Sequence, residues 1–175
     1  MIVNTLIVGG GPAGLAPLVS ASRSGLLDRI LTDGVAIAER GTTIGAGRIG
    51  RYAVRSDSTG NTLTSCIAEN PHPAMAALCD HPTARAVAAY QGGSVPLSLV
   101  GEFMELIGHT LRDVLVASGN DVFLGHEAIN SKRLRDGFWR TKLKRLADGA
   151  DVFGESRVVV MATGGNQPLS YLQRR

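Results

Sequence analysis

The feature that most constrains the fold is a glycine-rich stretch directly after an apolar run near the N-terminus. Residues 2–8 form a nearly continuous apolar run, which is typical of a strand covered on both faces of a parallel sheet. Gly9, Gly11 and Gly14 then fill the three glycine positions of the pattern G-x-G-x-x-G. The first permits a sharp turn, the second admits a pyrophosphate close to the backbone, and the third lets a helix pack on the sheet. This stretch therefore predicts a strand, a tight turn and a helix.

The start of the predicted helix is suited to hold phosphate. Pro12 fits the first helical turn, because no N–H is needed there. Free backbone N–H groups and the positive end of the helix dipole point toward a ligand above the turn. The predicted phosphate contacts are Gly9, Gly10, Gly11, Pro12, Ala13 and Gly14.

A second strand with an acidic end supports this interpretation. The helix is expected over residues 13–24, with Gly25 as its stop, and residues 35–39 form the next apolar strand. Glu39 ends that strand, where a dinucleotide site places a carboxylate that accepts hydrogen bonds from the adenosine ribose. The alternative is a solvated carboxylate at a strand end.

Length and composition narrow the class of protein. The 175 residues suit one domain with an inserted lobe. The net charge of +3 suits an anionic ligand. The sequence has no helix with clustered basic residues, so nucleic-acid binding is not expected. No signal-type or membrane-spanning segment is recognised, so no membrane is expected. Two cysteines make no disulfide framework, which predicts a cytoplasmic protein.

Residues 40–61 are rich in glycine, hydroxyl groups and arginine, and predict a long loop. Its glycines would let the backbone lie against an extended ligand, and its arginines would bind phosphates. The alternative is a solvated connector. The candidate contacts in this loop are Arg40, Gly45, Gly47, Arg48, Gly50, Arg51 and Arg55.

The middle of the chain predicts an inserted helical lobe and a crossover helix. Prolines among alanines in residues 62–97 indicate two short helices. The cysteines and histidines of this lobe match no zinc-ligand spacing, so no metal is predicted. Residues 97–118 carry apolar side chains at helical spacing, and His109 is expected at the surface. The four residues considered as metal ligands are Cys66, His72, Cys79 and His81.

The last third predicts strands. Residues 121–129 form an expected third strand, and two or three short antiparallel strands follow, with Trp139 and Leu143 on one face. Residues 157–165 form a buried strand that ends in a glycine turn. The predicted fold is therefore α/β: a Rossmann-like parallel sheet with helices on one side, a small antiparallel β-meander and the inserted helical lobe.

This order of parts resembles the FAD domain of the two-dinucleotide-binding-domain flavoproteins, which include glutathione reductase, flavin monooxygenases and N-hydroxylating monooxygenases. The resemblance covers residues 1–50 and 121–165, and rests on the glycine pattern together with Ala-Thr-Gly at 162–164. It implies that the glycines hold the FAD pyrophosphate and that Glu39 holds the ribose. It also implies that the backbone near Ala128 meets adenine, and that Thr163 and Gly164 lie beside the cofactor.

Departures from the family pattern refine the expectation. Cys66 and Cys79 are too far apart for the redox pair of the disulfide reductases, and no strand precedes the second glycine run at residues 45–50. The Gly-Asp that binds the flavin ribitol near the family's C-terminus does not occur in the sequence. A fragment, a compact variant and one subunit of a larger flavoenzyme remain open, with a slight preference for a fragment or a subunit completed by a second polypeptide.

The function predicted from this resemblance is an FAD-dependent oxidoreductase of the monooxygenase or dehydrogenase type, with NAD(P)H as a candidate co-substrate. No catalytic base is assigned. The candidates are Tyr52, Asp57, His72 and His81, because their segments are expected to face the flavin. The alternatives are an NAD(P)-dependent Rossmann dehydrogenase and a non-catalytic nucleotide-binding subunit of a complex.

Overall fold

The computed structural model describes residues 1–164, which fold around a six-stranded sheet. The strands lie in the order β5-β2-β1-β8-β7-β6. Their bounds are β1 Ile2–Val8, β2 Val35–Glu39, β5 Asp121–Leu124, β6 His126–Arg133, β7 Trp139–Arg145 and β8 Asp151–Met161. The predicted α/β fold is confirmed, although Gly165 of the last expected strand lies outside the described residues.

Four of the six strands, β5, β2, β1 and β8, are parallel, so their carboxyl ends lie at one edge of the sheet. β1 pairs in parallel with both β2 and β8, and β2 pairs in parallel with β5. The last three residues of β1, Leu6 to Val8, and the apolar residues 35–38 of β2 are nearly inaccessible, because both faces of these segments are covered. The glycine turn, Glu39 and residues 162–164 therefore meet at the carboxyl edge of the sheet, where such folds bind ligands.

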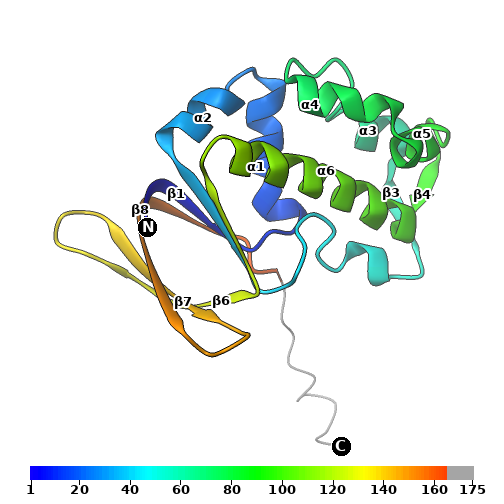
Figure 1. The fold of residues 1–175 in the computed structure, drawn as a ribbon. Helices are drawn as coiled ribbons and strands as arrows, with labels where there is room; N and C mark the ends of the chain where they lie inside the picture. Colours follow the sequence, from blue (N-terminus) through cyan, green and yellow to red (C-terminus); the bar gives the residue numbers. More distant parts are fainter. Residues whose placement is uncertain (165–175) are drawn as a thin grey trace, which may run out of the picture.

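Helices cover one face of the sheet (Figure 1). They are α1 Pro12–Arg23, α2 Leu27–Asp33 and α6 Leu97–Ala117. In α6 the apolar side chains at helical spacing, from Val100 to Leu115, pack into one large core with β1 and β2. The expected long helix is confirmed, and His109 is exposed on it as predicted. α2 is not among the elements predicted from the sequence.

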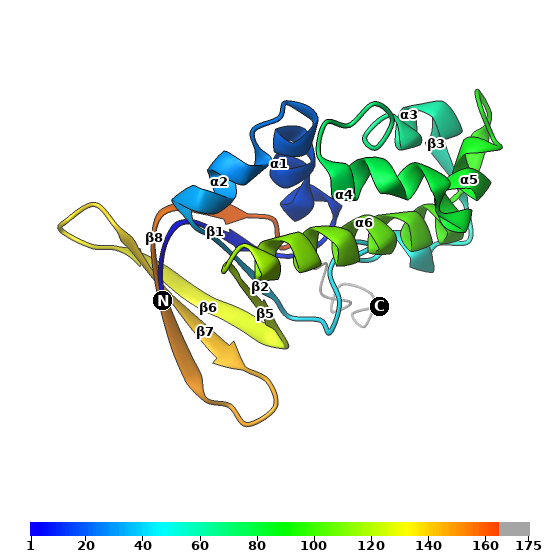
Figure 2. The ribbon, with the colours of Figure 1, turned by 45° about the horizontal axis from the view of Figure 1, so that its top comes forward.

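The antiparallel strands cover the opposite face. β7 pairs with β8 and with β6, and the twist of the sheet carries this meander beneath β1 and β2 (Figure 2). Leu143 is fully buried there against Leu6 and Val8 of β1 in a second, smaller core. The meander thus shields the side of the parallel sheet that has no helices.

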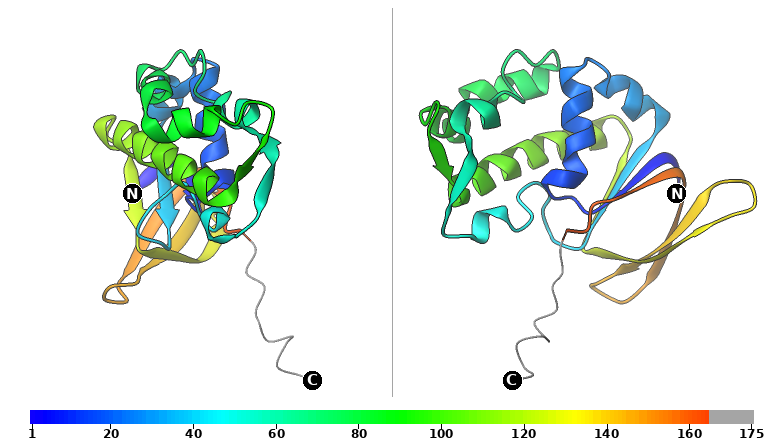
Figure 3. Two further views of the ribbon diagram at one scale, coloured as in Figure 1. Left: turned by 90° about the vertical axis from the view of Figure 1, so that its right-hand side faces the viewer. Right: turned by 180° about the vertical axis from the view of Figure 1, so that it is seen from behind.

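The small lobe, residues 55–96, extends beside α6, away from the meander (Figure 3). β3 Arg55–Thr59 pairs with β4 Ser94–Pro96, and the helices between them are α3 Gly60–Thr64, α4 Pro73–Ala76 and α5 Pro82–Ala88, with a 3-10 helix at Ala77–Asp80. Two short helices were expected, and the two-stranded sheet was missed. β3 is polar, so only its pairing with a distant strand makes it a strand.

Three predicted boundaries are wrong. The buried strand expected over residues 157–165 is part of β8, which begins at Asp151 and ends at Met161, and its Val158 and Met161 are exposed. The loop expected over residues 40–61 ends at residue 54, and it contains a 3-10 helix at Ile49–Arg51. The strand expected over residues 121–129 is broken at Gly125, whose φ of 65° is left-handed. β5 joins β2 before this break, and β6 joins β7 after it. Among the described residues no helix is both long and apolar enough to cross a membrane.

Candidate functional site

A groove of about 1060 Å³ runs along the carboxyl edge of the parallel strands. One wall is the glycine turn between β1 and α1 together with Glu39 at the end of β2. The other wall is the loop from residue 40 to residue 52 with the first turns of α6. Ala162, Thr163 and Gly164, which follow β8, also line it. The groove therefore gathers segments that are far apart in the sequence.

The glycines of the turn are required for different reasons. A side chain at Gly9 would overlap the backbone of Ala162, and one at Gly14 would overlap the carbonyl of Gly9. At Gly11, by contrast, an added Cβ would meet only the Cα of Gly47, at 3.7 Å, an ordinary contact. The protein itself thus needs Gly9 and Gly14 to be bare, whereas the bare Gly11 leaves room for a ligand.

The first turn of α1 offers backbone donors to the groove. Gly11 is the N-cap, its extended backbone carries no side chain to cap the helix, and Pro12 occupies the first helical position as predicted. The first N–H groups of a helix have no acceptor within the helix. Uncapped N–H groups and the dipole favour an anion at this point.

Glu39 points at the glycine turn. Its Oε2 accepts a hydrogen bond of 2.6 Å from the N–H of Gly10, and its Oε1 accepts one of 2.6 Å from the N–H of Gly41. The carboxylate is therefore fixed at the groove by two backbone donors. The alternative of a solvated strand-end carboxylate does not describe this arrangement.

The opposite wall is built by close approach of backbone to helix. A side chain at Gly45 would overlap the backbone of α6, and one at Gly108 would overlap the backbone of the loop. Gly50 and Gly101 face each other, so a side chain on either would crowd the backbone of the other. No strand leads directly into this glycine run, since β2 ends at Glu39, so the run is not a second nucleotide-binding turn. Gly47 differs because it faces Pro12 and Gly11 at the groove and not α6.

The arginines of the loop divide into two groups. Arg40, Arg48 and Arg51 line the groove, and Arg40 also lies 3.8 Å from the carboxylate of Glu127. Arg55 does not line it: this side chain stacks on Tyr90 and donates to the carbonyl of Ser94 in the small lobe. The expectation for Arg55 as a phosphate ligand is wrong, because its strand turns it toward β4.

Of the remaining predicted cofactor contacts, Thr163 and Gly164 line the groove. Ala128 does not line it, because its side chain packs on the second core within β6. Its neighbour Glu127 pairs with Arg40, so this strand approaches one end of the groove. A backbone contact from Ala128 stays a prediction.

Three of the four candidate catalytic residues lie outside the groove. His72 contacts Asp28 of α2 at 3.7 Å, on the far side of α1, and His81 caps α5 by accepting from the N–H of Thr83. Asp57 is exposed on β3. Tyr52 is half-exposed and lines the groove. The expectation that the lobe turns its histidines toward the cofactor is therefore wrong.

No metal or disulfide site accompanies the groove. No group of three or more potential metal ligands occurs within residues 1–164. Cys66 and Cys79 are both free thiols, and burial raises the pKa of the Cys66 thiol above its usual value. A thiol with a raised pKa is a poor nucleophile, which agrees with the absence of the reductase cysteine motif.

Three polar residues of α6 line the groove without having been predicted there. Ser98, Glu102 and Glu105 stand on its first turns, and Glu105 accepts from the hydroxyl of Thr43 at 3.1 Å. In the sequence they belong to the polar side of an amphipathic helix, which is indistinguishable from a solvated surface. Only the loop laid across α6 makes that side a wall.

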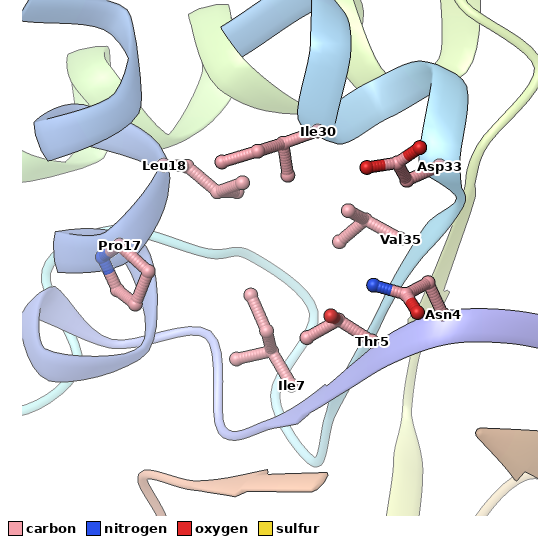
Figure 4. A pocket seen from close by; sticks show the side chains of 8 residues that line it. All are labelled: Asn4, Thr5, Ile7, Pro17, Leu18, Ile30, Asp33 and Val35. Carbon is pink, nitrogen blue, oxygen red and sulfur yellow. The ribbon is translucent and has the colours of Figure 1, made fainter. Parts of the chain in front are cut away.

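A second, smaller hollow of about 150 Å³ lies between α1, α2 and β1, away from the groove (Figure 4). Side chains from both helices face the strand across it, with the amide of Asn4 and the carboxylate of Asp33 at one end. Pro17, inside α1, contributes to its rim. Its lining is Asn4, Thr5, Ile7, Pro17, Leu18, Ile30, Asp33 and Val35, and none of these was a predicted site residue.

Comparison with known proteins gives a sequence relative. The chain is 34% identical over 128 residues to CMP-5'-(3-aminopropyl)phosphonate hydroxylase of Streptomyces rubellomurinus, which covers 71% of this chain and 29% of that protein. No protein-family model matches the chain. The chain thus spans less than a third of the length of this curated relative.

Solved structures share the fold. Ornithine hydroxylase PvdA from Pseudomonas aeruginosa matches with a TM-score of 0.66 and 15% identity, over 99% of this chain and 43% of that one. The myxobacterial chondrochloren halogenase CndH, an FAD-dependent halogenase, matches with a TM-score of 0.56 and 15% identity, over 95% and 38%. At 15% identity these matches show a shared fold. The chain has the fold of the FAD-binding flavoproteins.

Proposed function

We propose that this chain is the FAD-binding part of a flavin-dependent monooxygenase. The observation that carries the proposal is the groove wall in which an uncapped helix start and a carboxylate from the neighbouring strand face the same space. This pairing suits a ligand with a diphosphate next to a ribose. The hydroxylase and halogenase relatives agree with it.

The described residues fit FAD in three places. The N–H groups of the first turn of α1 would bind the diphosphate, with Arg48 and Arg51 facing it across the groove. Glu39 would accept hydrogen bonds from the ribose hydroxyls, because its two hydrogen bonds from backbone N–H groups leave other lone pairs of the carboxylate free. Thr163 and Gly164 would border the cofactor where the chain leaves β8. FAD itself would supply the redox chemistry.

The substrate we propose carries a primary amine. The two hydroxylases among the relatives are named for aminopropylphosphonate and ornithine, and both of these compounds have an amine at the end of a three-carbon chain. The expected resemblance to N-hydroxylating monooxygenases points the same way. NAD(P)H is the proposed reductant, as the family resemblance implies.

We also propose that a further polypeptide segment or subunit completes the active site. Of the four candidate catalytic residues, Tyr52 alone lines the groove formed by the described residues. The relatives with this fold are two to three times longer. Gel filtration together with identification of co-purifying chains tests this: a monomer of 175 residues with full hydroxylase activity would overturn it.

The cofactor proposal is tested by an absorption scan of freshly purified protein and by mass spectrometry of the small molecule it releases. Titration with FAD and NADH side by side then distinguishes a flavoprotein from an NAD(P)-dependent dehydrogenase. We expect saturable FAD binding with tighter affinity than for NADH. Protein that lacks a flavin spectrum and gains none with added FAD would refute the proposal.

A further inference from the structure

Both the backbone N–H and the backbone carbonyl of Gly10 are hydrogen-bonded within the protein. Its N–H donates to Glu39 at 2.6 Å, and its carbonyl accepts from the N–H of Gly45 at 2.8 Å. A side chain at Gly10 would also overlap Ile44. Although Gly10 stands in the middle of the glycine turn, its backbone therefore serves the fold.

Glu39 extends this connection away from the turn. Its second oxygen accepts from Gly41, and the carbonyl of Gly41 accepts from the N–H of Gly125 at 2.8 Å. The carbonyl of Gly125 accepts in turn from the N–H of Leu146, also at 2.8 Å. A chain of hydrogen bonds through Glu39 thus links the glycine turn and the end of β2 to Gly125, between β5 and β6, and to Leu146, directly after β7.

We propose that Glu39 is a positioning residue that holds the glycine turn in its phosphate-binding shape before any ligand binds. We call the carboxylate of Glu39 with its hydrogen bonds from Gly10 and Gly41 the latch. The amide donors that remain for a diphosphate are those of Gly11, Ala13 and Gly14. Gly10, which the sequence places among the phosphate contacts, donates to the latch instead. The proposal rests on the proposed FAD site but adds a role that the ribose contact does not include.

The physical reason is that a charged acceptor makes stronger hydrogen bonds than a neutral one. Two backbone donors converge on a single carboxylate, which fixes their spacing without any help from a ligand. A turn with several glycines has many conformations available, so restricting it beforehand lowers the ordering penalty on binding. Binding of any diphosphate then depends on Glu39, whether or not the ligand carries a ribose.

The decisive measurement is amide hydrogen exchange in the ligand-free chain, followed by nuclear magnetic resonance. Glutamine has one acceptor oxygen where the carboxylate has two. We therefore expect the amide of Gly10, of Gly41 or of both to exchange about 10- to 100-fold faster in Glu39→Gln than in the wild type, the factor typical of losing a hydrogen bond to a charged group. Glu39→Asp keeps the charge but is one methylene shorter, and should also lose protection at Gly10. Equal exchange in all three proteins would overturn the proposal.

The matched control is Glu102→Gln, which removes the same charge from the same groove without touching the turn. It should leave the exchange of Gly10 and Gly41 unchanged. Faster exchange in this control as well would mean that charge alone, and not the latch, governs the turn, and would also overturn the proposal.

Ligand binding separates the latch from the ribose contact. Removing a carboxylate near an anion should by itself strengthen anion binding, because repulsion is lost. If Glu39 shapes the turn, loss of that shape outweighs this gain, and Glu39→Gln should bind both inorganic pyrophosphate and ADP about 10-fold more weakly than the wild type. Glu102→Gln loses only the repulsion and should not bind pyrophosphate more weakly. If Glu39→Gln weakens ADP but leaves pyrophosphate unchanged or tighter, Glu39 acts on the ribose alone. Failure of the wild type to bind FAD would count against the proposed function, while the exchange result would still decide the latch.

Discussion

The two walls of the groove both depend on glycine, but for different purposes. On the wall formed by the glycine turn, Gly9 and Gly14 let backbone segments cross, while Gly11 leaves open space. On the wall formed by the loop and α6, Gly45, Gly50, Gly101 and Gly108 press backbone against backbone, with no free space between them. The first wall is therefore shaped for a ligand, and the second is shaped to hold the loop in place.

The largest effect is expected from Gly14→Ala. Its methyl group would overlap the carbonyl of Gly9, so the turn and α1 cannot both keep their positions. We expect a loss of about 3 kcal/mol in the free energy of unfolding, more than the gain of about 1 kcal/mol in helix propensity, together with loss of FAD binding. Chemical denaturation measures the first and flavin fluorescence the second. A variant as stable as the wild type would contradict the assigned role of Gly14.

Gly11→Ser tests the claim that this glycine serves the ligand. Serine is a favourable N-cap and Gly11 has an extended backbone, so stability should change by no more than about 0.5 kcal/mol. The hydroxyl would occupy the ligand's space and cap the free amides, so FAD affinity should fall about 10- to 100-fold. Denaturation and FAD titration of the same sample give both values. Unchanged affinity would place the diphosphate elsewhere.

Gly108→Ala tests the opposite wall. The methyl group would overlap the backbone of Ile44, and we expect a net destabilisation of about 1–2 kcal/mol after the gain in helix propensity. FAD affinity should fall less than in Gly11→Ser. The matched control is Gly92→Ala, where a Cβ has no neighbour within 4 Å and stability should be unchanged. Similar denaturation midpoints for both variants would show that the contact with α6 is loose.

The smallest effect is expected from Arg51→Ala. Arg51 is exposed at the rim of the groove, so its attraction to a diphosphate is screened by water and salt. We expect FAD affinity to fall about two- to fivefold at low salt and to match the wild type at high salt. Arg55→Ala, outside the groove, is the control and should not change the affinity at either salt concentration. A loss that persists at high salt would indicate a buried contact.

The sequence predictions were accurate for elements determined by residues close in the sequence, and less accurate for elements that depend on contacts with distant segments. The glycine turn, Pro12 at the start of α1 and the amphipathic α6 are determined by neighbours within a few residues, and these were predicted. The lobe was predicted less well, because β3 is polar and gains its strand geometry from β4 across the lobe. The single strand expected over residues 121–129 was wrong because Gly125 has a left-handed backbone that its neighbours in the sequence do not reveal.

The site followed the same division. Residues 9–13, predicted from the glycine pattern, line the groove, whereas Gly14 packs against Gly9 and the histidines chosen from the lobe lie elsewhere. Ser98 and Glu102 face the groove although their spacing on α6 indicates only a polar helix surface. Which polar surface becomes a wall depends on where a loop crosses it, and that depends on packing between distant segments.

By itself the sequence determined the strand, turn and helix of the nucleotide site and the acid that ends the second strand. Local spacing is enough for these, because steric freedom at glycine and the directions of backbone amides act over a few residues. The tertiary structure alone decided that Glu39 grips Gly10 and Gly41, that α6 forms the second wall, and that His72 and His81 face away. These arrangements depend on backbone meeting backbone across long stretches of chain, which periodicity and motif spacing do not record.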